Sequence, residues 1–75
     1  MKNEMLMMLE EAVGREFWTQ LNEMVEDIED LGYEVEEAND EYIAVVAEDD
    51  DDEQTFILYL GHANTTIWVE RIREM

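Results

Sequence analysis

The sequence contains no cysteine, no serine and no proline, and its single histidine is His62. Without cysteine the chain can form no disulfide and offers no thiolate. Without serine it has no serine nucleophile. Carboxylates are plentiful, but general acid–base catalysis needs environments that push two pKa values apart, and the sequence shows no such contrast. We therefore expect a protein that is not an enzyme, with His62 as a surface residue in a turn.

Positively charged residues are also scarce. No lysine or arginine occurs from Glu16 to Glu70, and this stretch holds 18 of the 22 acidic residues. The acids and bases of the two flanking segments cancel, so the whole net charge of −18 lies in this middle stretch. Such a charge disfavours nucleic acid and anionic membranes as partners and favours fast, salt-sensitive association with a basic surface.

The apolar content is nevertheless high for so acidic a chain. Hydrophobic residues make up 47% of the 75 residues, with two Trp, three Tyr and two Phe, which is more than acidic disordered tails usually carry. We expect one folded domain over residues 1–75. The N-terminal segment is interrupted by Glu4 and Glu10, which is typical of neither a signal peptide nor a membrane span. The default location is the cytoplasm.

The N-terminal part of the chain has helical periodicity over residues 3–31. Gly14 interrupts the pattern and favours two helices, 3–13 and 15–31, over one long helix. Gly32 suits the position just after a helix. The apolar positions step by three or four residues, which marks one buried face: Leu6, Leu9, Val13, Phe17, Leu21, Met24, Ile28 and Leu31, widened by Met5, Met8 and Val25.

The remainder, residues 33–72, has strand character. Short apolar segments separated by turn residues predict an antiparallel meander. The fold class is therefore α+β, with one or two N-terminal helices packed on a four-stranded antiparallel sheet. The acidic segment 49–53 and the segment 61–64 are predicted as connections, and the C-terminal RIREM as the end of a strand or a short helix. The expected strands are 33–38, 41–48, 54–60 and 65–72.

Two of these strands are apolar on both faces, so helices covering one face of the sheet leave a second apolar surface. Exposed apolar patches of this kind usually mark an interface, and a homodimer is the simplest way to cover one. The residues that we expect there are Tyr42, Ala44, Val46, Tyr59 and Trp68.

The acids are spaced as one face of a helix and one face of a strand. Glu23, Asp27 and Asp30 step by four and three residues, which separates them by about 4.5–6 Å along a helix. Glu34 and Glu36 lie about 6.6 Å apart along a strand. These spacings are of the order of those between nucleic-acid phosphates, so carboxylates on this scaffold could occupy the phosphate sites of a protein. The predicted partner-binding residues are Glu16, Glu23, Glu26, Asp27, Asp30, Glu34, Glu36, Glu37, Asp40, Asp49, Asp50, Asp51 and Asp52.

The acidic segment 49–53 also has the composition of a calcium loop, because carboxylate oxygens are preferred calcium ligands. Counting from Asp49, the glycine position of an EF-hand holds Gln54, and the closing glutamate position holds Leu60. We therefore expect no metal and no cofactor.

A small acidic domain with N-terminal helices on an antiparallel sheet resembles the DNA-mimic proteins, many of them phage-encoded, which include anti-CRISPR proteins, anti-restriction proteins and uracil-DNA glycosylase inhibitors. The glycosylase inhibitors use a Glu-Ser-Ile strand segment, which this serine-free chain lacks. The resemblance implies a stoichiometric inhibitor that occupies the nucleic-acid site of a Cas effector, nuclease or glycosylase in a bacterial host cell. It implies contacts from the helical and strand acids, with Tyr33, Tyr42 or Trp68 as anchors.

Two alternatives remain open at this point. The chain could be an acidic interaction or regulatory module that binds through its apolar sheet face, with the charge serving solubility. It could also be a domain adapted to high salt. Against the latter, the apolar residues are large and glutamate outnumbers aspartate 15 to 7.

Overall fold

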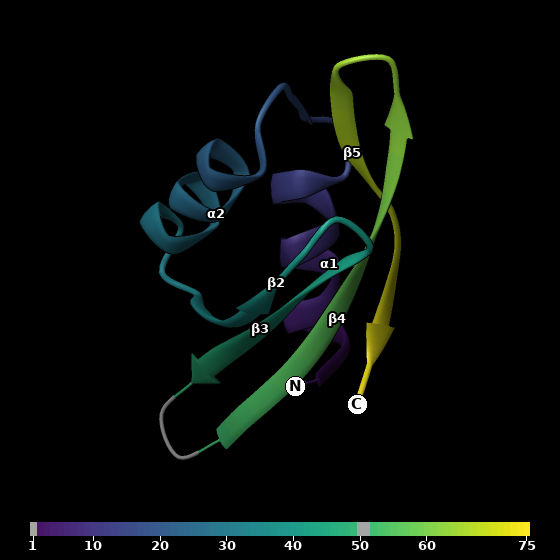
Figure 1. Cartoon of the computed structure of the whole chain (residues 1–75). Helices are drawn as coiled ribbons and strands as arrows, with labels where there is room; N and C mark the ends of the chain where they lie inside the picture. Colours follow the sequence, from purple (N-terminus) through teal and green to yellow (C-terminus); the bar gives the residue numbers. More distant parts are fainter. Residues whose placement is uncertain (1, 50–51) are drawn as a thin grey trace.

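A computed structural model of the chain describes residues 2–49 and 52–75. It is an α+β fold of two helices and one antiparallel sheet (Figure 1). Within the described residues, neither helix is long and apolar enough to cross a membrane. In chain order the elements are α1 (Lys2–Val13), β1 (Phe17–Trp18), α2 (Leu21–Asp30), β2 (Glu34–Ala38), β3 (Tyr42–Asp49), β4 (Asp52–Ala63) and β5 (Thr66–Glu74).

The sheet has the strand order β1-β5-β4-β3-β2. Strands β2 to β5 form the predicted meander, in which each strand pairs antiparallel with the next. The fifth strand is an addition to the prediction. It is the short β1, which pairs antiparallel with β5 through Phe17 with Trp68 and Trp18 with Ile67.

The helical region divides after Val13, close to the predicted break at Gly14, but the second helix starts later than expected. Residues 15–20 were predicted as helix, and the structure places Phe17 and Trp18 in β1 instead. Pairing with β5 decides the conformation here. Trp18 is 7% exposed and Phe17 is 67% exposed, so the two side chains alternate between the core and solvent as in an edge strand. After α2, Gly32 has φ of 101°, which confirms its predicted role just beyond the helix end.

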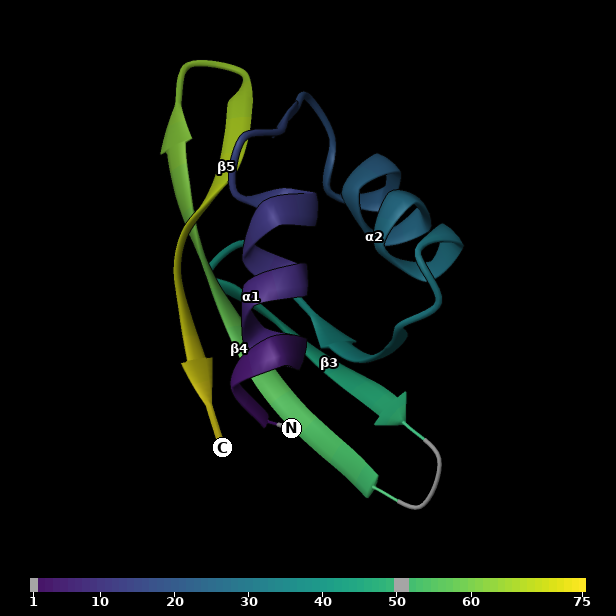
Figure 2. The ribbon, with the colours of Figure 1, turned by 180° about the vertical axis from the view of Figure 1, so that it is seen from behind.

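Both helices cover the same face of the sheet (Figure 2), and the core lies between the helices and that face. The predicted helical stripe is confirmed for Leu9, Val13, Met24 and Ile28, which are at most 1% exposed. They pack in the same cluster as sheet side chains such as Phe56. Two members were predicted wrongly: Leu31, the last residue of the stripe, is 51% exposed, and Met8, expected to widen it, is 65% exposed.

The strands are longer than predicted at both turns. Strand β4 continues through Gly61 to Ala63, so the turn lies at Asn64, whose φ is 57°. Asp49 and Asp52, predicted in a connection, are paired strand residues. Asp50 and Asp51 lie outside the described residues. The C-terminal segment ends as strand.

Two glutamates interrupt the strand registers. Val35 pairs with Val45 and Glu37 with Ala44, so Glu36 has no direct partner. Glu70 is skipped in the same way, because Tyr59 pairs with Arg71 and Leu60 with Val69. An extra residue of this kind bends a strand and increases its twist, which accounts for the curl of the sheet around the helices.

Gly61 provides a test of the packing on β4. A Cβ atom built on Gly61 would lie 2.5 Å from the ring atom Cε2 of Trp68. We expect Gly61→Ala to lower the free energy of unfolding by about 1–3 kcal/mol, because the indole must move. Denaturant unfolding measures this change. The same substitution in a Trp68→Ala background should cost much less, and an equal cost in both backgrounds would contradict the contact.

Candidate functional site

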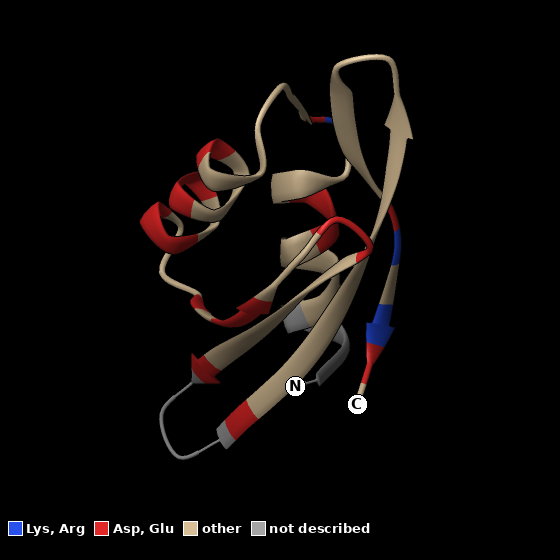
Figure 3. Cartoon of the chain, viewed as in Figure 1, with Lys and Arg blue, Asp and Glu red and all other residues tan. Residues whose placement is uncertain are grey.

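Exposed acidic residues are concentrated on α2 and on the neighbouring strand β2. On α2, Glu23, Glu26 and Asp30 are exposed on the side away from the buried Met24 and Ile28. Strand β2 packs against α2, and Figure 3 shows its acidic residues continuing those of the helix. We call the exposed carboxylates of α2 the acidic surface, and its members are Glu23, Glu26, Glu29 and Asp30. Glu34 and Glu37 of the neighbouring strand lie on the face of the sheet opposite the helices, in register with Val46 and Ala44.

A shallow cleft extends this surface to the end of β3. Its volume is about 400 Å³, and its lining includes Glu29 of α2, Glu34 of β2 and Glu48 of β3. Tyr33 also lines it, and burial raises the pKa of the Tyr33 hydroxyl above the ordinary 10.0. Glu29 and Glu48 are missing from the predicted partner-binding residues. The periodicity of one helix or one strand does not show that residues of α2, β2 and β3 lie together in the folded chain.

Asp27 has a different environment from its helical neighbours. Its Oδ2 accepts a hydrogen bond of 2.7 Å from Nε1 of Trp18. A buried indole N–H needs an acceptor, and this bond fixes β1 to α2. Asp27, which was predicted to contact a partner, is thus already engaged within the molecule.

The other predicted residues are dispersed. Glu16 lies between α1 and β1, next to Arg15. Asp40 is in the β2–β3 turn, where its carbonyl oxygen contacts Nε2 of His62. Asp49 and Asp52 pair at the far end of the β3–β4 hairpin. Over residues 2–49 and 52–75, no three His, Cys, Asp or Glu side chains are grouped to hold a metal ion.

The face of the sheet opposite the helices carries a second candidate site. The registers place Tyr42 opposite Tyr59 and Ala44 opposite Ile57, with Trp68 further along opposite Gly61. The five residues predicted for an apolar sheet face do lie on one face. We call it the open face, and its residues are Glu34, Glu37, Tyr42, Ala44, Val46, Thr55, Ile57, Tyr59, Trp68, Arg71 and Arg73.

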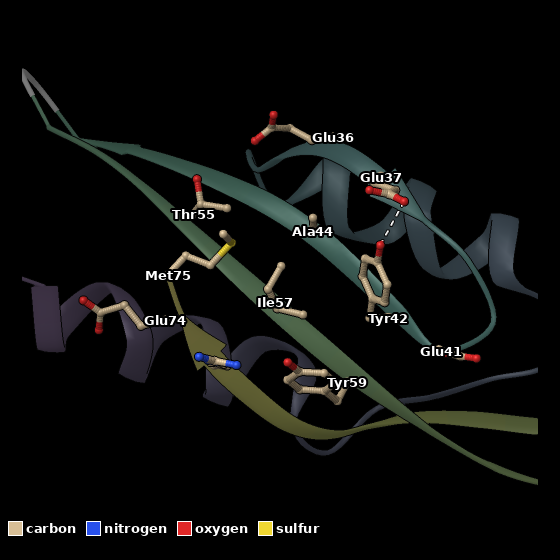
Figure 4. A pocket seen from close by; sticks show the side chains of 11 residues that line it. Glu36, Glu37, Glu41, Tyr42, Ala44, Thr55, Ile57, Tyr59, Glu74 and Met75 are labelled. Atoms are coloured by element: carbon tan, nitrogen blue, oxygen red, sulfur yellow. Dashed lines mark hydrogen bonds between the residues drawn. The ribbon is translucent and has the colours of Figure 1, made fainter.

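An open groove of about 1020 Å³ crosses this face (Figure 4). Its floor is Ala44, Thr55 and Ile57, with Tyr42 and Tyr59 along the strands. Acidic residues of β2 line one side, and β5 lines the other. The groove is therefore apolar in the middle and polar along both rims.

Aromatic contacts order the β5 side of the open face. The guanidinium carbon of Arg71 lies 4.7 Å from the ring centroid of Tyr59, a cation–π geometry. The rings of Phe17 and Trp68 meet edge to face, with centroids 6.3 Å apart. Phe17 and the two arginines were not predicted for this face, because their placement depends on the pairing of β1 with β5 and on the bulge at Glu70.

Comparison with known proteins adds no relative: the chain matches no protein-family model, no curated protein and no solved structure.

The bond between Trp18 and Asp27 predicts a stability difference between adjacent acids. Asp27→Ala should lower the free energy of unfolding by about 1.5–3 kcal/mol, because a charge-assisted bond is lost and the buried indole N–H is left without a partner. Glu26→Ala is the matched control, since it removes the same charge from the same helix, and it should change stability by less than about 0.5 kcal/mol. Equal effects of the two variants in denaturant unfolding would show that the bond contributes nothing.

Tyr42 provides a pH test. Its hydroxyl donates a 2.9 Å hydrogen bond to Oε1 of Glu37, and this bond, with burial and the nearby negative charge, raises the pKa of Tyr42 above 10.0. The folded state therefore holds this proton more tightly than the unfolded state, so the contribution to stability is complete below pH 10 and is lost at higher pH.

We expect the pKa of Tyr42 in Glu37→Ala to fall toward 10.0. Nuclear magnetic resonance of ring-labelled tyrosine measures this titration, with Tyr42→Phe to assign the signal. An unchanged Tyr42 titration in Glu37→Ala would mean that the bond does not exist in solution.

Proposed function

We propose that the protein is a DNA-mimic inhibitor that binds a nucleic-acid-binding protein through its acidic surface. The observation that carries this proposal is the concentration of exposed carboxylates on α2 and β2, within a stretch that contains no lysine or arginine. Ordinary surfaces intersperse the two signs of charge. A surface that keeps one sign has a field that attracts a basic partner and repels acidic ones.

The spacing of the carboxylates supports nucleic acid as the ligand that is imitated. Glu23, Glu26 and Asp30 follow one another by three and four residues along α2, or about 4.5 and 6 Å of helical rise. Their relative positions are set by a helix that is anchored through the buried Met24 and Ile28. The backbone that carries these carboxylates is already ordered, so only their side-chain rotamers must be fixed upon binding, which favours affinity.

Like charges at these spacings weaken the helix that carries them, by about 0.2–0.5 kcal/mol for each pair. Along α2, Glu23 precedes Glu26 by three residues and Glu26 precedes Asp30 by four. Mixed charges would stabilise the helix better, so a requirement for negative charge at these positions explains the sequence better than stability does.

The target that we propose first is a Cas effector, which would make the protein a phage-encoded anti-CRISPR protein acting in the cytoplasm of a bacterial host cell. A restriction enzyme and a glycosylase are the other targets of the class. In each case the inhibitor would act stoichiometrically. Lysine and arginine side chains of the target would contact α2, flanked by the glutamates of β2, with Tyr33 beside Glu29 and Glu34 as the aromatic neighbour.

Displacement of fluorescent duplex DNA tests this proposal. A guide-loaded Cas effector, a restriction enzyme and a uracil-DNA glycosylase are each titrated with the protein at low and at moderate salt. We expect one of them to release its DNA stoichiometrically, with weaker inhibition at the higher salt, because the contacts are electrostatic. Retention of DNA by all three at low salt would contradict the proposal.

Charge reversal then tests the surface. The variant Glu23→Lys/Glu26→Lys/Asp30→Lys should inhibit at least about 100-fold more weakly, since like charges facing one another cost several kcal/mol. Asp27 is left intact because it binds Trp18. The control Glu10→Lys/Glu11→Lys alters two exposed acids of α1. Equal inhibition by the α2 variant and the wild type, with both folded by circular dichroism, would assign the contact to another surface.

A further inference from the structure

The open face has opposite charges along its two sides. Arg71 and Arg73 project from β5 opposite Tyr59 and Ile57. Glu34 and Glu37 project from β2 opposite Val46 and Ala44. Two strands, β3 and β4, separate the two sides, and their side chains form the apolar floor of the groove. The face is thus positive on one side, apolar in the middle and negative on the other.

We propose that two copies of the chain pack by their open faces about a two-fold axis that runs parallel to the strands. In a two-fold interface the same patch is used twice, so a contact of one residue with another is repeated in reverse. An axis parallel to the strands places β5 of one copy over β2 of the other. The registers align Glu37, Ala44, Ile57 and Arg73 in one row across the face, so Arg73 of each copy then faces Glu37 of the other, and the apolar floors meet in the centre.

The charges also disfavour the other two-fold arrangement in which the open faces of two copies meet. A two-fold axis in the plane of the sheet but across the strands would place β5 over β5 and β2 over β2. Arginines would then face arginines and glutamates would face glutamates, which is costly when the groups lose water. The side-to-side polarity of the face therefore selects one orientation as well as one partner.

The dimensions of the molecule are compatible with a dimer of this kind. The molecule measures 40 × 18 × 18 Å, so a long side has a projected area of about 700 Å², of the order of the area that each partner buries in a standard interface. Tyr42 and Tyr59 lie on the groove, and large aromatic side chains are frequent anchors at the centre of interfaces.

Pairing through the sheet edges is the competing way to join two copies, and the charges oppose it. Beyond Ile67 and Trp68, β5 is not covered by β1. Antiparallel pairing of this edge with itself, centred on Arg71, Ile72 or Arg73, would set arginine directly opposite arginine. Like charges directly opposite one another destabilise a strand pair, so the edge is protected and the face remains.

Salt distinguishes this interface from the acidic surface. Each copy carries a net charge of −18, so two copies repel one another, and added salt weakens that long-range repulsion more than it weakens close pairs buried in an interface. The dimer should therefore strengthen with salt, whereas binding of a basic target through α2 should weaken. In the dimer Glu34 and Glu37 face the second copy, and the carboxylates of α2 remain on the outside for a target.

Sedimentation equilibrium over a range of concentrations tests the interface. Between about 20 mM and 500 mM NaCl we expect the dimer dissociation constant to fall by about 10-fold, because the Debye length shrinks from about 20 Å to about 4 Å. A protein that remains an 8.9 kDa monomer at high salt and high concentration would overturn the proposal.

Exchange of the charges gives the decisive control. Arg71→Glu/Arg73→Glu should weaken the dimer by 10-fold or more. Glu34→Arg/Glu37→Arg should weaken it as well, although that variant reduces the net charge from −18 to −14, each of two replacements adding two charges. If only net charge mattered, the second variant would dimerise better. The variant with all four substitutions restores both the net charge and the charge complementarity, so it should recover dimerisation. Failure to recover it in a folded protein would refute the paired contacts.

The absence of cysteine permits a clean cross-linking measurement. Ile57 lies in the groove on one of the two central strands, close to the proposed axis. Ile57→Cys treated with a short bis-maleimide should give a covalent dimer, and Glu26→Cys on the outer side of α2 should not. Equal cross-linking of both variants would indicate random collision and would count against this interface.

Discussion

Burial of apolar side chains between two helices and one face of a sheet has to hold together a chain whose charges repel one another. Residues such as Leu9, Met24 and Phe56 are completely buried in that layer, while the carboxylates are directed outward. A domain of this size has only a few kcal/mol of net stability. The separation of apolar interior from acidic exterior therefore leaves little tolerance for a misplaced charge, and every other property of the surface depends on it.

The helices cover only one side of the sheet, and this asymmetry gives the protein two unlike surfaces. One is the exposed side of α2, continued by β2, where carboxylates predominate. The other is the open face, where aromatic and aliphatic side chains lie between arginines and glutamates. Under the two proposals salt would act on these surfaces in opposite directions, so the protein could separate recognition of a basic partner from association with itself.

Much of the fold could be predicted from periodicity. The helical stripe identified Leu9 and Ile28 as core residues, and the two later strands that are apolar on both faces identified an apolar second face. The periodicity failed at Phe17 and Trp18, because steps of three and four residues continue through them while their conformation is decided by a strand formed some fifty residues later. Sequence alone also could not locate the bulge at Glu70, because a bulge depends on the neighbouring strand.

The candidate sites were predictable to a different extent. Composition alone indicated an acidic surface, and helical spacing placed most of its residues on α2. It could not show that Asp27 is held by Trp18, since hydrogen bonds between elements leave no periodic signal. The arginines were assigned no surface, because which face of β5 they occupy depends on the register with β4.

The pairing of β1 with β5 has a consequence for synthesis of the chain. Phe17 and Trp18 emerge from the ribosome well before Ile67 and Trp68, their partners in the sheet, and α1 also packs against β5. Until β5 has emerged, the N-terminal half has no complete surface on which to fold, and contacts so distant in sequence close slowly. During that interval the many acidic side chains would keep nascent chains on neighbouring ribosomes apart, so the charge would protect the polypeptide before it has any partner to bind.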